Sequence, residues 1–306
     1  MEKNNKYRLL MILAMVIWGG SWVCAKLIST NLHYQKLVFI RFVLTFLFFI
    51  PPVFIFRENL RIGLDTAKRI VIGSLFYTLY SQVFFLGLSR GSAGLGGILV
   101  TSLVPVITFA IMSFSTGLRI GFREAAGLAM GFLGSLVILK IDSVSSQQLF
   151  LSGNIFFVIG AFLWAGVTIN SQKTQSTISL WVYSFYLNGV ASILQLAFVT
   201  PYGLDGLFPA DISFWILMIY LSLMSTVFAT SLYFYSTRLI GSYKASAFTF
   251  IVPSSAVILS WIFLHEIPAP TTLVGGCISI AALYLIQSNR NPVVRRGNEL
   301  VTRTVE

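Results

Sequence analysis

Basic side chains within apolar stretches are the residues of this sequence best placed to do chemistry. Arg41 lies inside the apolar stretch 34–56, and Lys26 lies near the end of the apolar stretch 8–28. A charge within a segment long enough to cross a membrane is costly, which makes it a candidate for function by default. If both cations face one cavity, they favour a carboxylate or another anionic group on a ligand. In the alternative, both long side chains reach the membrane surface.

Tryptophans in the same stretches are candidates for ligand contact. Trp18 and Trp22 are four residues apart, so they lie on one helical face near the middle of the first stretch. Trp164 takes the corresponding place in a later stretch. Membrane tryptophans usually lie at the interfaces, which a pair in the middle of a stretch does not fit. Packing against a neighbouring helix is the first interpretation of the three rings, with contact to a ligand as the alternative.

Tyrosine and threonine side chains form polar stripes on a third and an eighth apolar stretch. Tyr77 and Tyr80 lie near one helical face of the third, and Thr226 and Tyr233 lie near one face of the eighth. Within lipid, such stripes are expected to face protein or water, although a threonine hydroxyl also bonds to carbonyls of its own helix.

Three amides are predicted to line a cavity because we expect them to be too large for satisfaction within their own helices. They are Asn170, Asn188 and Gln195. The full predicted substrate-binding set is Trp18, Trp22, Lys26, Arg41, Tyr77, Tyr80, Trp164, Asn170, Asn188, Thr226 and Tyr233.

Two prolines interrupt the fourth and ninth stretches. Pro105 and Pro253 each remove a backbone donor and free a carbonyl, which a neighbour, a water or a ligand must satisfy inside a membrane. We predict that they are hinges about which the two halves of the chain open and close. A static kink that improves packing is the alternative.

The residues needed for catalysis or metal binding do not come together in the sequence. His33 and His265 lie at the ends of apolar stretches, and no aspartate accompanies them in the core. Cys24 and Cys277 lie inside apolar stretches without metal-ligand spacing. We therefore predict no catalytic residues, no metal, no disulfide and no cofactor, and an intramembrane enzyme is the least favoured class.

Composition identifies the elements that position these side chains. Of 306 residues, 56% are hydrophobic and 10% are charged, whereas a soluble domain is about 25% charged. The apolar runs are long and continuous, as membrane-spanning helices require, so we predict an all-α membrane protein with ten transmembrane helices. The predicted spans are 8–28, 34–56, 69–88, 92–115, 122–140, 151–171, 180–200, 212–236, 242–264 and 271–288.

The net charge of +11 is explained by orientation in the membrane. With the N-terminus in the cytoplasm, 16 of the 21 lysines and arginines fall on the cytoplasmic side and five fall elsewhere. The bias predicts two cytoplasmic termini, with 289–306 as a cytoplasmic tail. It also accounts for the charge without a nucleic-acid partner, which leaves membrane lipid and a small-molecule substrate as the expected partners.

The two halves of the chain share a spaced pattern. Arg90, Pro105 and Gly127 recur as Arg238, Pro253 and Gly275, each 148 positions later, and Thr101 and Val104 match their partners at the same spacing. Each half holds five predicted spans, and because five is odd, the second half must cross the membrane in the opposite direction. We therefore predict two inverted five-helix repeats, 8–141 and 151–288, with a substrate site where they meet.

These residues resemble the drug/metabolite transporter superfamily, in particular its EamA-like family. The stretch from Trp18 to Lys26 is similar to the family's opening motif, and Arg41 falls where the family usually places an arginine. Pro253, Glu266 and Gly275 are similar to the closing signature of the family's domain, although Leu118 replaces the acid in the first half. The resemblance implies a ten-helix carrier of small metabolites, often an exporter, in a cytoplasmic membrane.

We predict a secondary transporter of a small organic metabolite, with an amino acid or a similar zwitterion or anion as the expected substrate. The acids lie near the ends of the predicted spans, which favours facilitated transport or exchange over a proton-driven pump. A scaffold or receptor that transports nothing is the alternative. The sequence leaves open the substrate, the direction of transport, the coupling ion and the choice between a monomer and a homodimer.

Overall fold

The computed structural model describes residues 2–90, 93–117, 121–139, 154–208, 211–264, 270–288, 293–296 and 299–302. The first half of the chain forms helices α1 (Glu2–Ile28), α2 (Tyr34–Ile55), α3 (Leu64–Arg90), α4 (Ala93–Thr116) and α5 (Phe122–Leu139). The second half forms α7 (Asn154–Thr174), α8 (Leu180–Val199), η2 (Thr200–Tyr202), α9 (Ile212–Ile219), η3 (Tyr220–Thr230), α10 (Ser231–Ile240), α11 (Ser242–Ala247), η4 (Phe248–Ile251), α12 (Val252–Leu264) and α13 (Pro270–Ser288). A two-stranded antiparallel hairpin, β1 (Val293–Arg296) and β2 (Glu299–Thr302), follows.

Side-chain caps mark where three of these helices begin. Before α2, the His33 ring accepts a hydrogen bond from the Gln35 N–H, and before α8 the Ser179 hydroxyl accepts one from the Val182 N–H. Asp211 caps α9 in the same way. Each cap satisfies a backbone donor that the first turn of a helix leaves free.

Helical segments lie in all ten predicted spans, and seven helices are long and apolar enough to cross a membrane within the part of the chain that the structure describes. The seven are Tyr7–Ile28, Tyr34–Ile55, Leu64–Arg90, Gly96–Thr116, Ile155–Thr174, Leu180–Tyr202 and Ile212–Ile240. Large apolar side chains face outward, with Phe114 and Phe122 exposing 93% and 89% of their surface. Such exposure suits lipid rather than water. The protein is therefore a multi-pass helical membrane protein.

The eighth and ninth predicted spans differ from the uninterrupted helices that their sequences suggest. The eighth is α-helical in α9 and α10 but forms an eleven-residue π-helix, η3, between them. Within η3, the hydroxyls of Thr226 and Thr230 donate to carbonyls five residues earlier, those of Leu221 and Ser225. The ninth comprises α11, the short 3-10 helix η4 and α12.

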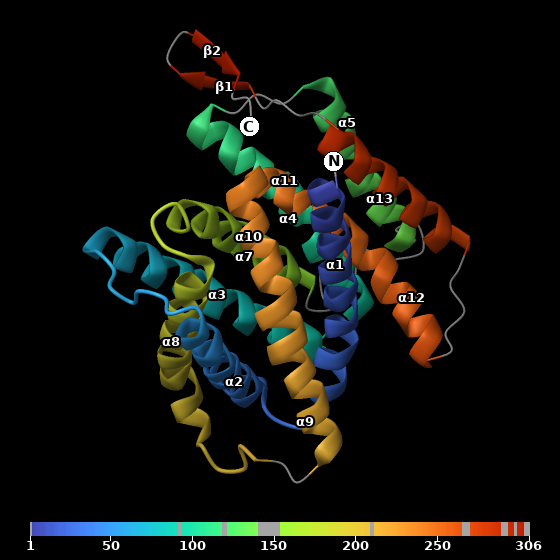
Figure 1. Ribbon diagram of the computed structural model, residues 1–306. Coiled ribbons are helices and arrows are strands. Elements are labelled where there is room, and N and C mark those ends of the chain that lie inside the picture. Colours follow the sequence, from blue (N-terminus) through green and yellow to red (C-terminus); the bar gives the residue numbers. More distant parts are fainter. Residues whose placement is uncertain are drawn as a thin grey trace.

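Helices of the two halves pack against each other in reciprocal pairs. Helix α1 packs against η3 and α12, and α7, its predicted counterpart, packs against α3 and α4. Helices α2 and α8 pack together, as do α5 and α13. The N-terminal end of α1 and the C-terminal end of α13 lie at the same end of the molecule (Figure 1). Helix pairs between the halves therefore enclose the centre of the molecule.

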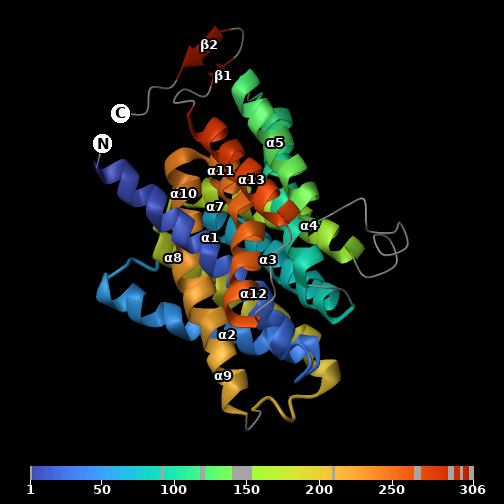
Figure 2. The same cartoon turned by 90° about the vertical axis from the view of Figure 1, so that its right-hand side faces the viewer.

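Glycines allow α5 and α13 to lie side by side, as both views show (Figures 1 and 2). A Cβ atom added to Gly275 would lie 2.5 Å from the Gly134 carbonyl oxygen, and one added to Gly127 would lie 3.0 Å from the Ala282 carbonyl oxygen. Gly127 and Gly275 are 148 positions apart, and so are Gly134 and Ala282. The same close contact therefore occurs twice, with the roles of the two helices exchanged.

Candidate functional site

A small cavity of about 40 Å³ lies at the centre, between helices of both halves. Aromatic rings, hydroxyls and one guanidinium form its wall. The lining residues are Trp18, Ser21, Trp22, Arg41, Tyr80, Phe84, Val100, Thr101, Val104, Trp164, Ser225, Thr230 and Thr249.

Residues that correspond between the halves meet in the wall of this cavity. The Trp18 and Trp164 rings contact each other edge to face, with their centroids 5.3 Å apart. The Thr249 hydroxyl donates a 2.7 Å hydrogen bond to the Thr101 carbonyl, and these two residues are 148 positions apart. The cavity therefore lies where equivalent parts of the two halves come together.

Arg41 of α2 supplies the charge of the cavity wall. Its side chain is 9% exposed, and its Nη2 donates a 3.1 Å hydrogen bond to the Thr226 hydroxyl of η3. Its Nε is buried and has no hydrogen-bond partner. A buried guanidinium with a free donor is an electrostatic site for a carboxylate or another anionic group.

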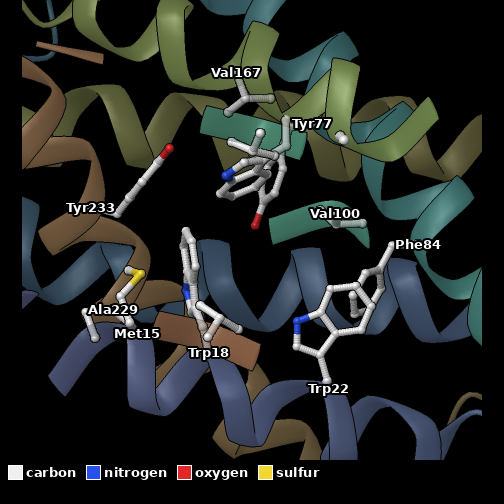
Figure 3. Close-up of a cluster of buried hydrophobic side chains, with 14 of the residues drawn as sticks. Met15, Trp18, Trp22, Tyr77, Phe84, Val100, Val167, Ala229 and Tyr233 are labelled. Atoms are coloured by element: carbon white, nitrogen blue, oxygen red, sulfur yellow. The ribbon is translucent and has the colours of Figure 1, made fainter. Parts of the chain in front are cut away.

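The π-helix η3 holds the first tryptophan. Trp18 Nε1 is 3.2 Å from the Ser225 carbonyl oxygen and 3.3 Å from the Thr230 hydroxyl. Trp22 instead packs on the Phe84 ring at a centroid distance of 4.7 Å. Trp18 and Trp22 extend from one face of α1 into the aromatic cluster, as their spacing predicts (Figure 3).

Three predicted aromatic residues surround Trp164. Tyr80 lines the cavity and lies 4.7 Å from the Trp164 ring. Tyr77 and Tyr233 are fully buried, with centroids 5.9 Å and 6.1 Å from the same ring. The Tyr233 hydroxyl also lies 2.9 Å from the Thr168 hydroxyl. Tyr77 and Tyr233 thus support the tryptophan wall from outside the lining (Figure 3).

Three other predicted residues make contacts away from the lining. The Lys26 ammonium donates a 2.6 Å hydrogen bond to the Leu88 carbonyl near the end of α3. The Asn170 amide donates to the Arg69 carbonyl, also in α3. The Asn188 amide donates to the Ser184 carbonyl of its own helix, whereas its Oδ1 is buried without a hydrogen-bond partner, so the helix satisfies only part of this amide. An asparagine side chain reaches the carbonyl four residues earlier, as serine and threonine do.

The predicted hinge prolines lie beside the cavity. Pro105 is buried within α4 next to the lining residue Val104. Pro253 is buried in the first turn of α12, directly after η4, which carries the lining residue Thr249. In the described residues, no cluster of three or more His, Cys, Asp or Glu side chains could hold a metal. His265 and Glu266 lie outside those residues.

Sequence reasoning omitted several lining residues from the predicted site. They are Ser21, Phe84, Val100, Thr101, Val104, Ser225, Thr230 and Thr249. The repeat could have indicated some of them, because Thr101 and Val104 match the residues 148 positions later. Thr101 and its partner Thr249 both line the cavity. Ser21 follows Trp18 by three residues and so shares its helical face.

A multi-pass helical fold with a polar and aromatic cavity between its halves is the architecture of a membrane transporter. The model of the EamA-like transporter family matches the chain twice, at residues 5–140 and 151–288. The chain therefore belongs to the EamA-like transporter family. Its members are transporters rather than enzymes, so a small-molecule substrate is the partner that family membership implies.

Some relatives of this chain match more than nine-tenths of it. An uncharacterized transporter of Archaeoglobus fulgidus is 27% identical over 94% of this chain and 99% of its own length. A probable amino-acid metabolite efflux pump of Escherichia coli is 24% identical over 92% of this chain and 95% of its own length. A protein of known crystal structure superposes with a TM-score of 0.74 at 16% identity, over 92% of this chain and 96% of that chain, and this likeness shows a shared fold.

Proposed function

We propose that this protein is a secondary transporter that moves an amino acid or a similar small zwitterion or anion across the cytoplasmic membrane by alternating access. Arg41 carries the proposal, because a buried guanidinium in the cavity wall retains a donor without a partner. An anionic group on the substrate would satisfy this donor. The relative named as an amino-acid metabolite efflux pump supports the substrate class.

The proposed architecture is ten membrane-spanning helices in two inverted repeats, 8–141 and 151–288, with both termini and the tail 289–306 in the cytoplasm. The reciprocal helix pairs, above all the glycine contact that α5 and α13 make twice, support an inverted relationship between the repeats. The two ends of the helical region lie at one end of the molecule, which fits an even number of spans (Figure 1).

Movement of substrate is proposed to occur around the cavity. Trp18, Trp22, Tyr80, Trp164 and Arg41 would contact the substrate. Tyr77, Thr226 and Tyr233 would hold those side chains in place. Pro105 and Pro253 would bend α4 and α12 as the cavity opens to each side in turn.

Flux in proteoliposomes tests the proposal. We expect vesicles containing the protein to exchange radiolabelled amino acids supplied as a mixture, and we expect Arg41→Gln to reduce the exchange about 10-fold or more, the scale of a lost charge-assisted hydrogen bond. Arg61→Gln is the matched control, because Arg61 is exposed and lies outside the lining. Absence of flux with every solute would instead favour a scaffold or receptor.

A further inference from the structure

The Arg41 side chain is held by a hydrogen bond to one residue of η3. Thr226 accepts a hydrogen bond from its Nη2, whereas Nε has no partner. Guanidinium is planar and has five N–H donors, so a hydrogen bond to one nitrogen limits the orientations open to the others. The contact with Thr226 therefore restricts the orientation of the guanidinium in the cavity wall.

The Thr226 hydroxyl can act only as an acceptor toward Arg41. A hydroxyl has one proton, and Thr226 donates it to the Leu221 carbonyl over 2.8 Å. Its oxygen is left to accept from the guanidinium, which has no acceptor of its own. The π-helix gives the Thr226 proton its own partner, because the carbonyl five residues earlier lies within reach of the threonine hydroxyl.

The same π-helix positions the aromatic side of the cavity. The Ser225 carbonyl accepts from both the Trp18 indole and the Thr230 hydroxyl. One short segment thus orients the cation through Thr226 and an aromatic ring through Ser225. A ligand that presents a carboxylate to Arg41 would place its apolar part against Trp18.

We propose that Thr226 is a positioning residue that makes the cavity selective for carboxylates by holding the Arg41 guanidinium in the cavity wall. The inference rests on the proposed function, since it assigns a ligand class to the same cavity. Thr226 is not among the lining residues and acts through Arg41. Its effect is therefore on the preference for a charged ligand over a neutral ligand of the same shape.

Two ligands of the same shape and different charge can separate the effect of the carboxylate on binding from the effect of the aromatic body. 3-Phenylpropionate and 3-phenylpropanamide have the same aromatic body and differ in carrying a carboxylate or a neutral amide. Calorimetric titration of the purified protein in lipid nanodiscs would give a dissociation constant for each. We expect the wild-type protein to bind the carboxylate about 10-fold more tightly or better, because a charge-assisted hydrogen bond is roughly twice as strong as a neutral one.

Substitutions at Thr226 then test the positioning role. Thr226→Val keeps the shape but removes the acceptor, so we expect the preference to fall to about 3-fold or less, while Thr226→Ser restores it. Thr108→Val is the matched control, because Thr108 is fully buried and its hydroxyl has no hydrogen-bond partner. Should Thr226→Val fail to fold, Thr226→Ala removes the same acceptor and is expected to lose the same preference.

The outcomes distinguish this inference from the proposed function. A wild-type preference that persists in Thr226→Val and is lost in Arg41→Gln would overturn the positioning role alone. Equal binding of both probes by the wild-type protein, or a preference that survives Arg41→Gln, would overturn carboxylate binding at Arg41. Loss of the preference in Thr226→Val, without flux in vesicles, would uphold the inference and overturn transport.

Discussion

Helix α3 and its counterpart, the segment α9–η3–α10, show how the two halves of this protein have diverged. Helix α3 is a regular α-helix from Leu64 to Arg90 and contributes the Tyr80 and Phe84 side chains to the cavity. Its counterpart forms a π-helix and contributes hydroxyls and a backbone carbonyl. Helix α3 supplies aromatic rings to the cavity wall, whereas η3 makes hydrogen bonds to Arg41 and Trp18. A shared helix arrangement thus supports different chemistry on the two sides of the cavity.

The largest expected effect concerns the glycine contact between α5 and α13, which both halves of the chain share. Gly275→Leu should prevent α13 from packing on α5, because even a Cβ atom would lie 2.5 Å from the Gly134 carbonyl. We expect a loss of about 3 kcal/mol or more of stability, visible as little folded protein in size-exclusion chromatography. Gly63→Leu is the control, since nothing lies within 4 Å of a Cβ there. Normal folding of Gly275→Leu would show that the close contact is dispensable.

The two prolines allow the hinges of the halves to be compared. Pro253 directly follows the 3-10 helix η4, whereas Pro105 lies inside the α-helix α4. Because the backbone before Pro253 already departs from α-helical geometry, Pro253→Ala should slow turnover more, about 10-fold against about 3-fold for Pro105→Ala, with substrate affinity retained. Unchanged turnover in both variants would rule out the hinge hypothesis.

A comparison of Trp18 with Trp22 tests how much the hydrogen bond between Trp18 and η3 contributes to stability. Trp18→Phe removes the indole donor to Ser225, whereas Trp22 packs on Phe84 and Phe157. We expect Trp18→Phe to lose about 1 kcal/mol more thermal stability than Trp22→Phe, the usual contribution of one hydrogen bond. Comparison of melting curves in detergent measures this difference. Equal losses would mean that the bond to η3 contributes little.

The smallest expected effect concerns His33, which caps α2 and stacks on Tyr202 of the other half at a centroid distance of 4.1 Å. Burial and the nearby Lys36 lower the pKa of His33 from its ordinary value of 6.5. The neutral imidazole is therefore favoured, and its contribution to stability is present above that value and lost as the pH falls through the lowered pKa.

His33→Asn keeps a capping acceptor that does not titrate. Its melting temperature should therefore change slightly less than that of the wild-type protein between about pH 7.5 and about pH 5.5. An identical or larger pH dependence in the variant would contradict a role for this imidazole.

Particular residues show what the sequence could predict and what it could not. Long apolar runs place helices in all ten predicted spans, and i, i+4 spacing places Trp18 and Trp22 on one face. The π-helix has no signal in Tyr220–Thr230, which contains neither glycine nor proline, because carbonyl and hydroxyl partners decide it only after folding. For Asn188 the sequence could not tell that its amide N–H bonds within its own helix while its buried Oδ1 has no partner.

Accessibility of Ser21 tests alternating access around the central cavity most directly. Ser21 lines the cavity and follows Trp18 by one helical turn, and the free cysteines Cys24 and Cys277 can first be replaced by alanine. In sealed vesicles of known orientation, a membrane-impermeant thiol reagent should reach Ser21→Cys from either side, with substrate changing the two labelling rates in opposite directions. Labelling from one side only, at a rate that substrate does not change, would contradict a cavity that opens alternately to the two sides of the membrane.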